Sequence, residues 1–299
     1  MSDIENNLSL SGIKKLCNFK FSDYTTYRLG GAAKAAYFPE TEAEAAAVFD
    51  YLKEAGEKYT VLGKGSNVLV ADGFYDGFVI CTKFLRSIIK EDHCIYCRAG
   101  TTVAELLKFC IKEGIGGLEY LAGIPASIGG LALMNGGILE KHISENVSSV
   151  TIYDGKTREL SKEECNFAHK HSIMRDIDCV VLGVKLSFSA VPREAVKEKV
   201  QYYLKKRQSQ PKGKTCGCVF KNPPDASAGM LIDKAGIKGL KYGGAEVSSQ
   251  HANFIVNNGA KASDVYNLIA EVKRRVYDFC GVTLEEEVIY IGDFDDFDG

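Results

Sequence analysis

Apolar residues recur with helical spacing in several segments of the chain, and most of these segments begin at a capping residue. Thr41 to Glu44 and Thr102 to Glu105 each place a glutamate three residues after a threonine, which is the capping box of a helix N-terminus. Ser161 to Glu164 is a third such box. It predicts a short helix that reaches His169 to Ser172.

Three further helices are predicted in the last part of the sequence. One begins at Pro192 and ends before Pro211, where we place the main domain boundary. A short helix is expected to end at Gly236, with Met230, Leu231 and Ala235 on one face. The final helix is expected to be capped by Ser263 and to end at Gly281. Its inward positions are Val265, Leu268, Ile269, Val272 and Val276.

Short β-type runs lie between these helices. The sequence predicts strands over residues 32–38, 59–62, 68–70, 146–154, 179–189 and 282–291. In the run from 179 to 189, large apolar residues alternate with smaller or polar ones, which indicates one buried face. An acidic tail, 292–299, is expected to be disordered.

A glycine-rich turn joins two of the predicted strands. It reads Leu62-Gly63-Lys64-Gly65-Ser66-Asn67 and runs directly into Val68-Leu69-Val70. A dinucleotide fingerprint would carry a third glycine and lead into a helix, so this turn is not a Rossmann site. Its backbone amides can still form a nest for a pyrophosphate, although an ordinary tight turn fits the sequence equally well.

A second glycine-rich region extends from Gly116 to Gly137 and holds seven glycines. Its centre contains Gly123, Ile124 and Pro125, followed by Ser127, Gly129, Gly130 and Asn135. Such a density of glycine lets the backbone approach a large planar or phosphorylated ligand closely. The alternative is a mobile surface loop, but the glycines alternate with bulky apolar residues, which favours a ligand wall.

The overall composition is that of an ordinary soluble protein. The 299 residues carry a net charge of −2, which gives no reason to expect nucleic acid or an anionic membrane as partner. No signal peptide and no run of 18 apolar residues is present, so we expect a cytoplasmic protein. A monomer is expected.

Ten cysteines raise the possibility of a metal site. Cys94 and Cys97 form a CxxC, but a strand would point these two thiols to opposite faces. No second pair completes a zinc site, so we predict no metal. Six isolated cysteines are expected to be small core residues: Cys17, Cys81, Cys110, Cys165, Cys179 and Cys280.

The stretch from Lys214 to Asn258 combines glycines with reactive and polar side chains. Cys218 lies beside a glycine and shortly before Lys221 and Asn222, and Gln250 follows near the end of the stretch. This mixture suits the lining of a binding site. The alternative is a glycine-rich connection between domains.

Six short motifs occur in a fixed order between Tyr24 and Gly292. They are Tyr27-Arg28-Leu29-Gly30-Gly31, Leu62 to Asn67, Gly123-Ile124-Pro125, Gly129-Gly130 with Met134-Asn135, Val219-Phe220-Lys221-Asn222-Pro223, and Leu284-Glu285-Glu286-Glu287-Val288. In this order they resemble the UDP-N-acetylenolpyruvoylglucosamine reductases, the MurB family of flavoenzymes.

The resemblance implies an α+β fold in which two FAD-binding subdomains of the PCMH/VAO type precede a C-terminal α/β substrate-binding domain. The expected bounds are 15–83 and 84–208 for the two subdomains, 209–285 for the substrate domain, and 286–299 for a returning strand and tail. FAD would be held by residues Leu62 to Asn67, Gly123 to Pro125, Ser127, Gly129, Gly130 and Asn135.

The resemblance also implies an activity. NADPH would reduce FAD, and the flavin would pass hydride to the enolpyruvyl ether of UDP-N-acetylglucosamine enolpyruvate. Cys218 occupies the position of the family's proton-donating serine, Lys170 that of an arginine, and Glu287 that of the C-terminal glutamate. Substrate contacts are expected from Lys221, Asn222, Gln250 and Ser172.

Several positions depart from the family pattern. Cys218 replaces serine with a better acid, whereas Lys170 keeps the charge of arginine but loses its planar fork. His169 replaces tyrosine, residues 138–140 differ, and Ala126 stands where a glycine is usual, which predicts a strained backbone there. The departures other than Cys218 also suit a rival hypothesis, a divergent paralogue that binds flavin or nucleotide without reductase activity.

Overall fold

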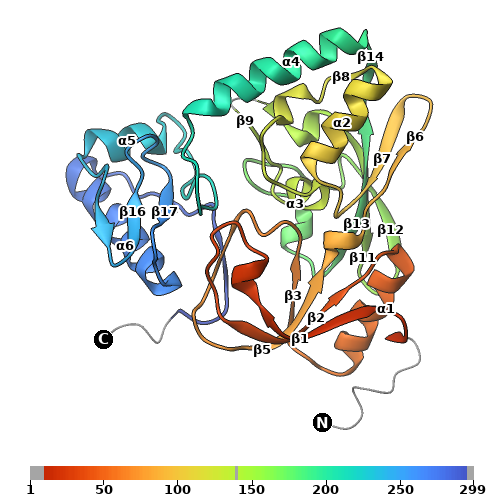
Figure 1. Ribbon diagram of the computed structural model, residues 1–299, viewed down its shortest axis with the longest axis horizontal. Coiled ribbons are helices and arrows are strands. Elements are labelled where there is room, and N and C mark those ends of the chain that lie inside the picture. Colours follow the sequence, from red (N-terminus) through yellow and green to blue (C-terminus); the bar gives the residue numbers. More distant parts are fainter. Residues whose placement is uncertain (1–9, 139–140, 295–299) are drawn as a thin grey trace. The chain divides into compact units, whose positions relative to one another are not determined.

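The computed structural model of the protein describes residues 10–138 and 141–294. The chain forms two compact units, both shown in Figure 1. Of the described residues, the first unit contains 10–17, 35–64, 77–138 and 141–208, and the second contains 18–34, 65–76 and 209–294. Two expectations lie partly outside the described residues: the departure at 139–140 and the end of the acidic tail, 295–299.

The regular elements are short, and strands outnumber helices among the described residues. The α-helices are α1 (Glu42–Glu54), α2 (Val103–Glu113), α3 (Ile128–Leu133), α4 (Arg193–Lys206), α5 (Ala228–Lys234) and α6 (Ala262–Cys280). The 3-10 turns are η2 (Phe21–Asp23), η3 (Thr82–Phe84), η4 (Glu119–Leu121), η5 (Ile143–Glu145), η6 (Ile173–Arg175) and η7 (Arg207–Ser209).

The strands of the first half are β1 (Lys14–Lys20), β2 (Ala32–Phe38), β3 (Tyr59–Leu62), β4 (Val68–Val70), β5 (Tyr75–Cys81), β6 (Ile88–Lys90), β7 (Cys94–Arg98), β8 (Ile115–Gly116), β9 (Gly137–Ile138) and β10 (Lys141–His142). Those of the second half are β11 (Val147–Tyr153), β12 (Thr157–Ser161), β13 (Val180–Ser187), β14 (Ser189–Ala190), β15 (Lys241–Tyr242), β16 (Ala245–Val247), β17 (Ile255–Asn257) and β18 (Ile289–Ile291).

Two larger β-sheets contain most strands between Lys14 and Ser187. One has the strand order β1-β2-β5-β3, and the other has the order β12-β11-β13-β7-β6. Strand β13 is the centre of the second sheet, and its first five residues are all buried. The face predicted as core is buried at Val180, Leu182, Val184 and Leu186, and the other face is covered as well at the start of the strand.

The helices predicted from capping boxes at Thr41 and Thr102 are present as α1 and α2. Both capping boxes form, since Thr41 and Thr102 each accept from the backbone of a glutamate that bonds back to them. The box at Ser161 and Glu164 also forms, but the predicted helix does not follow. Cys165 is buried directly after the box, and Asn166 adopts φ 45°. The chain therefore forms a turn here instead of a helix.

The second unit packs α5 and α6 around the three-stranded sheet β15-β16-β17 (Figure 1). All five inward positions predicted for α6 are buried, and Gly281 ends the helix at φ 71°. The predicted cap was wrong, since the N-cap is Lys261 and Ser263 lies inside the first turn. On the predicted face of α5, Leu231 and Ala235 are half-buried against the core, but Met230 is exposed, and the fully buried residues are Ala228 and Ile232. The last strand is also shorter than predicted, because β18 begins only at Ile289 and pairs parallel with β4.

The ten cysteines are all free thiols. Cys17 and Cys280 are exposed, so the expectation that they are core residues was wrong. Cys97 is buried in β7 while Cys94 is half-buried, as expected for an offset of three on a strand. Within the described part of the chain, no helix is both long and apolar enough to cross a bilayer.

Candidate functional site

The turn from Gly63 to Asn67 leaves two backbone amides available to an anion. It links β3 to β4 as predicted, with strand on both sides. Gly65 adopts φ 64°, and its carbonyl accepts from the backbone and the hydroxyl of Thr26 at 2.9 and 3.3 Å. Among the described residues, the amides of Lys64 and Ser66 have no hydrogen-bond acceptor. The turn therefore fits a pyrophosphate that would take these amides.

Gly63 and Ser127 lie against each other in the first unit. A Cβ added to Gly63 would overlap the hydroxyl of Ser127. That hydroxyl caps α3 by accepting from the amide of Gly130 at 3.3 Å. Two residues that were predicted to bind the cofactor are thus brought together from segments 64 residues apart.

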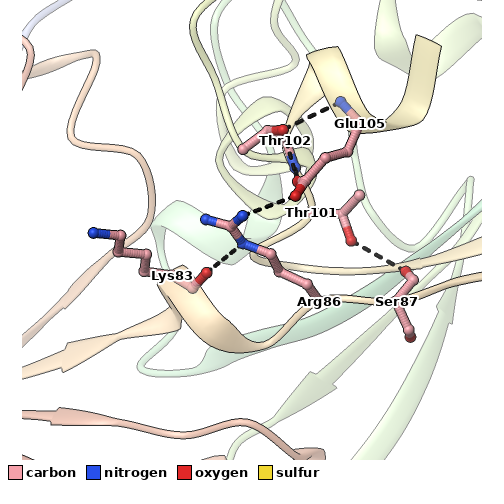
Figure 2. Close-up of polar contacts among 6 residues, drawn as sticks. All are labelled: Lys83, Arg86, Ser87, Thr101, Thr102 and Glu105. Atoms are coloured by element: carbon pink, nitrogen blue, oxygen red, sulfur yellow. Dashed lines mark hydrogen bonds and ion pairs between the residues drawn. The ribbon is translucent and has the colours of Figure 1, made fainter. Parts of the chain in front are cut away.

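A group of polar contacts lies at the start of α2 (Figure 2). Arg86 donates to Glu105 at 2.8 Å, and Glu105 accepts from the amide and hydroxyl of Thr102 at 2.8 and 2.7 Å. Thr101 donates to the carbonyl of Ser87 at 3.1 Å. Because Thr102 pairs antiparallel with Ser127, this cluster anchors the start of α2 and the segment before α3 together.

The glycines around α3 allow close packing, and the amides of Gly129 and Gly130 already have acceptors within the protein. A Cβ on Gly129 would meet Ala99, and the Gly129 amide already donates to the Ala99 carbonyl at 2.9 Å. Gly123 adopts φ 80° beside the side chain of Arg207. The strain predicted at Ala126 was wrong, since its φ is not positive, and its carbonyl accepts from Val103 at 3.1 Å.

Lys170 lies in a tight turn of the first unit. Ala168 and His171 exchange backbone hydrogen bonds of 3.1 and 3.3 Å, and Lys170 adopts φ 57° between them. Asn135 holds this turn by donating to the Ala168 carbonyl at 2.9 Å. Ser172 is fully buried and donates to the Leu133 carbonyl at 2.8 Å. The fixed turn presents a half-buried cation.

Ser172 and Asn135 therefore have structural partners of their own. Asn135 also accepts from the amide of Ser144 at 3.2 Å and adopts φ 43°, a conformation that asparagine tolerates. The buried hydroxyl of Ser172 makes it a support for the Lys170 turn rather than an exposed ligand group.

Cys218 lies in the second unit on a short extended segment. Cys218 forms an antiparallel β-bridge with Phe254. Two residues later, Phe220 forms another with Glu286. The amide of Glu287 donates to the carbonyl of Val219 at 2.7 Å. The proposed proton donor and the proposed glutamate are thus on adjacent backbone segments, and both are half-buried.

A second thiol lies behind Cys218. Cys216 is buried beside the phenol of Tyr27. Burial raises the pKa of the Cys216 thiol to about 12, and the Glu287 carboxylate adds to the increase, while Tyr27 opposes it. Cys216 therefore stays protonated at neutral pH. No motif in the sequence indicates its contact with Tyr27.

The remaining predicted substrate residues occupy the same unit. Lys221 pairs with Glu285 at 3.3 Å, and the Asn222 side chain accepts from the amide of Ala228 at 3.0 Å, at the start of α5. Gln250 is exposed, and its backbone amide donates to the hydroxyl of Ser248 at 3.1 Å. Among the described residues, no group of three or more His, Cys, Asp or Glu side chains is arranged to hold a metal ion.

Two family models match the chain. Residues 33–161 match an FAD binding domain, and residues 208–291 match the UDP-N-acetylenolpyruvoylglucosamine reductase C-terminal domain. These ranges contain the glycine turn and α3 in one case, and Cys218 and Glu287 in the other.

Individual relatives extend the match to almost the full length. The chain is 39% identical to the UDP-N-acetylenolpyruvoylglucosamine reductase of Moorella thermoacetica, covering 92% of this chain and 93% of that protein. It is 35% identical to that of Listeria monocytogenes, covering 92% and 94%. The crystal structure of the reductase from Thermus caldophilus superposes with a TM-score of 0.79 at 33% identity, covering 94% of this chain and 99% of that one. The chain therefore belongs to the UDP-N-acetylenolpyruvoylglucosamine reductase (MurB) family.

Proposed function

We propose that this protein is an NADPH-dependent, FAD-containing reductase that converts UDP-N-acetylglucosamine enolpyruvate into UDP-N-acetylmuramate for peptidoglycan precursor synthesis. The observation that carries the proposal is the relationship to named reductases over more than nine-tenths of the chain. The expected substrate and NADPH follow from that relationship, and the FAD binding domain supports the cofactor.

The glycine turn would hold FAD through backbone groups. The amides of Lys64 and Ser66 are suited to the pyrophosphate, and Gly63 leaves room for the capping hydroxyl of Ser127. When bound, FAD supplies the chemistry of accepting hydride from NADPH and delivering it to the enolpyruvyl carbon.

Reduction of the enolpyruvyl group places negative charge on the carbon next to the carboxylate, and that carbon must then receive a proton. Lys170 would stabilise the charge through its ammonium group, which its turn holds in place. Cys218 would donate the proton, since a thiol is a far stronger acid than the alkyl hydroxyl of serine. Glu287 would assist the protonation or the stabilisation of the enolate.

The spectrum of the purified protein tests the proposal directly. A flavin absorbance should be present, NADPH should bleach it, and the enolpyruvyl substrate should restore it. Cys218→Ala should leave the bleaching intact and slow the restoration by about 10²- to 10⁴-fold, the usual contribution of a general acid. Cys280→Ala, at an exposed thiol, is the matched control and should change neither step.

Two outcomes would contradict parts of this proposal. A flavin that NADPH reduces but the substrate never reoxidises would favour a paralogue without reductase activity. If Cys218→Ala retains both steps at the original rates, Cys218 is not the proton donor.

A further inference from the structure

The side chain of Asn253 bonds to both backbone groups of a single residue, Phe220. Its Oδ1 accepts from the Phe220 amide at 2.9 Å, and its Nδ2 donates to the Phe220 carbonyl at 2.8 Å. Asn253 is 3% exposed and Phe220 is 2% exposed, so water does not compete for these groups. The carboxamide thus supplies the donor and the acceptor that a neighbouring strand would supply.

Pairing on the opposite side explains why Phe220 needs such a partner. The backbone amide of Lys221 donates to the Glu285 carbonyl at 2.9 Å, and the backbone amide of Glu287 donates to the Val219 carbonyl at 2.7 Å. These bonds flank the pair formed by Phe220 and Glu286, so the amide and carbonyl of Phe220 point away from residues 285–287. Without Asn253, two buried backbone groups would lack partners.

The backbone of Asn253 is tied to the same segment. Its carbonyl accepts from the amide of Val219 at 2.9 Å, and its own amide donates to Nδ1 of His251 at 3.3 Å. Three hydrogen bonds therefore connect Asn253 to Val219 and Phe220, immediately after Cys218. The segment with Cys218 has little freedom to move relative to residues 285–287.

We propose that Asn253 is a positioning residue, whose carboxamide sets the location of the Cys218 thiol relative to Glu287. Asn253 does not take part in the chemistry itself, because both of its side-chain groups are occupied by Phe220. The catalytic consequence rests on the proposed function, in which Cys218 is the proton donor. The geometric part concerns the thiol alone.

Asn253→Asp tests the geometric part, because it keeps the shape and the acceptor but places an oxygen against the Phe220 carbonyl. The rate at which iodoacetamide alkylates Cys218 would be followed by peptide mass spectrometry in the folded protein. We expect this rate to rise at least fivefold, as the half-buried thiol becomes more accessible. The exposed thiols Cys17 and Cys280 are internal controls whose rates should stay unchanged.

A surface substitution and a smaller side chain complete this experiment. Asn258→Asp introduces the same chemical change at an exposed asparagine and should leave the alkylation of Cys218 as it is. If Asn253→Asp does not fold, Asn253→Ser leaves space for water at Phe220 and should give the same increase. An unchanged Cys218 rate in a folded variant overturns the proposal, whatever reaction the protein catalyses.

The two half-reactions test the catalytic consequence. In Asn253→Asp, reduction of the flavin by NADPH should stay within twofold, and reoxidation by the enolpyruvyl substrate should slow at least tenfold. The solvent deuterium isotope effect on reoxidation should increase, because proton transfer from a displaced thiol becomes rate-limiting. A parallel loss in both half-reactions would show a merely structural role. If the unaltered protein is never reoxidised by the substrate, the proposed function fails, and the alkylation result still decides the role of Asn253.

Discussion

The side-chain amide of Asn67 donates a 3.0 Å hydrogen bond to the backbone carbonyl of Glu287, which lies 220 residues later in the chain. The carbonyl of Asn67 in turn accepts from Ile289 at 3.0 Å, where β18 begins to pair with β4. The glycine turn proposed for the cofactor is thus connected directly to the segment of the proposed catalytic glutamate.

Removal of the Asn67 donor should loosen this connection. We expect Asn67→Leu to lower the free energy of unfolding by about 1–3 kcal/mol, because the Glu287 carbonyl loses its partner in a half-buried place. Reoxidation by the substrate should slow more than reduction by NADPH. Chemical denaturation and stopped-flow absorbance measure the two effects, and Asn258→Leu is the surface control. Equal stability of both variants would contradict the role given to Asn67.

The contact between Gly63 and Ser127 can be measured with a double-mutant cycle. Gly63→Ala should force the Ser127 hydroxyl away from α3 and cost about 1 kcal/mol through the lost cap. It should also reduce the flavin content of the purified protein. With Ser127→Ala already present, Gly63→Ala should cost less, since the overlap is gone.

Gly73→Ala is the matched control for that cycle. A Cβ at Gly73 meets no atom within 4 Å, and its φ is not positive. Strict additivity of Gly63→Ala and Ser127→Ala would show that the two residues do not interact.

Lys170 can be tested by charge and by shape. Lys170→Gln removes the cation and should lower kcat by roughly 10- to 100-fold, as expected for a hydrogen bond to a charged group worth about 1.5–3 kcal/mol. Lys170→Arg restores a planar fork that grips a carboxylate with two bonds, and its kcat should equal or exceed that of the original protein. Steady-state NADPH oxidation measures both. Lys162→Gln, an exposed cation of the same unit, should have no effect.

His251 predicts a pH dependence of stability. Burial lowers the pKa of its imidazole below the usual 6.5, and the charge of Lys238 lowers it further, while a backbone hydrogen bond opposes the shift. The unfolded chain therefore binds this proton first as the pH falls. The free energy of unfolding should be complete above about pH 6.5 and decrease below it, until the folded imidazole also titrates.

Denaturation at pH 7.5 and at pH 5.5 checks this expectation. In His251→Asn, which keeps an acceptor for the amide of Asn253, the difference between the two pH values should be smaller than in the original protein. His93→Asn, at an exposed turn, should leave the difference unchanged. If the free energy of unfolding of His251→Asn still differs between the two pH values as much as in the original protein, other groups cause the pH dependence.

Local signals in the sequence were sufficient for most elements but not for their packing. The boxes at Thr41 and Thr102 and the glycine at 281 act within one or two helical turns, so they could be recognised without the fold. The box at Ser161 formed as well, yet burial of Cys165 directed the chain into a turn. Likewise, α5 is too short for its own pattern to decide which face is buried.

By itself, the sequence determined the family, the glycine turn between two strands, and the positions of Cys218, Lys170 and Glu287 as candidates, because motifs and their order are properties of the chain. Only the tertiary structure decided what holds these residues. Asn253 carries no motif, and Asn67 was predicted only as part of the glycine turn. Their structural roles come from backbone groups 33 and 220 residues away that need a partner once the chain has folded.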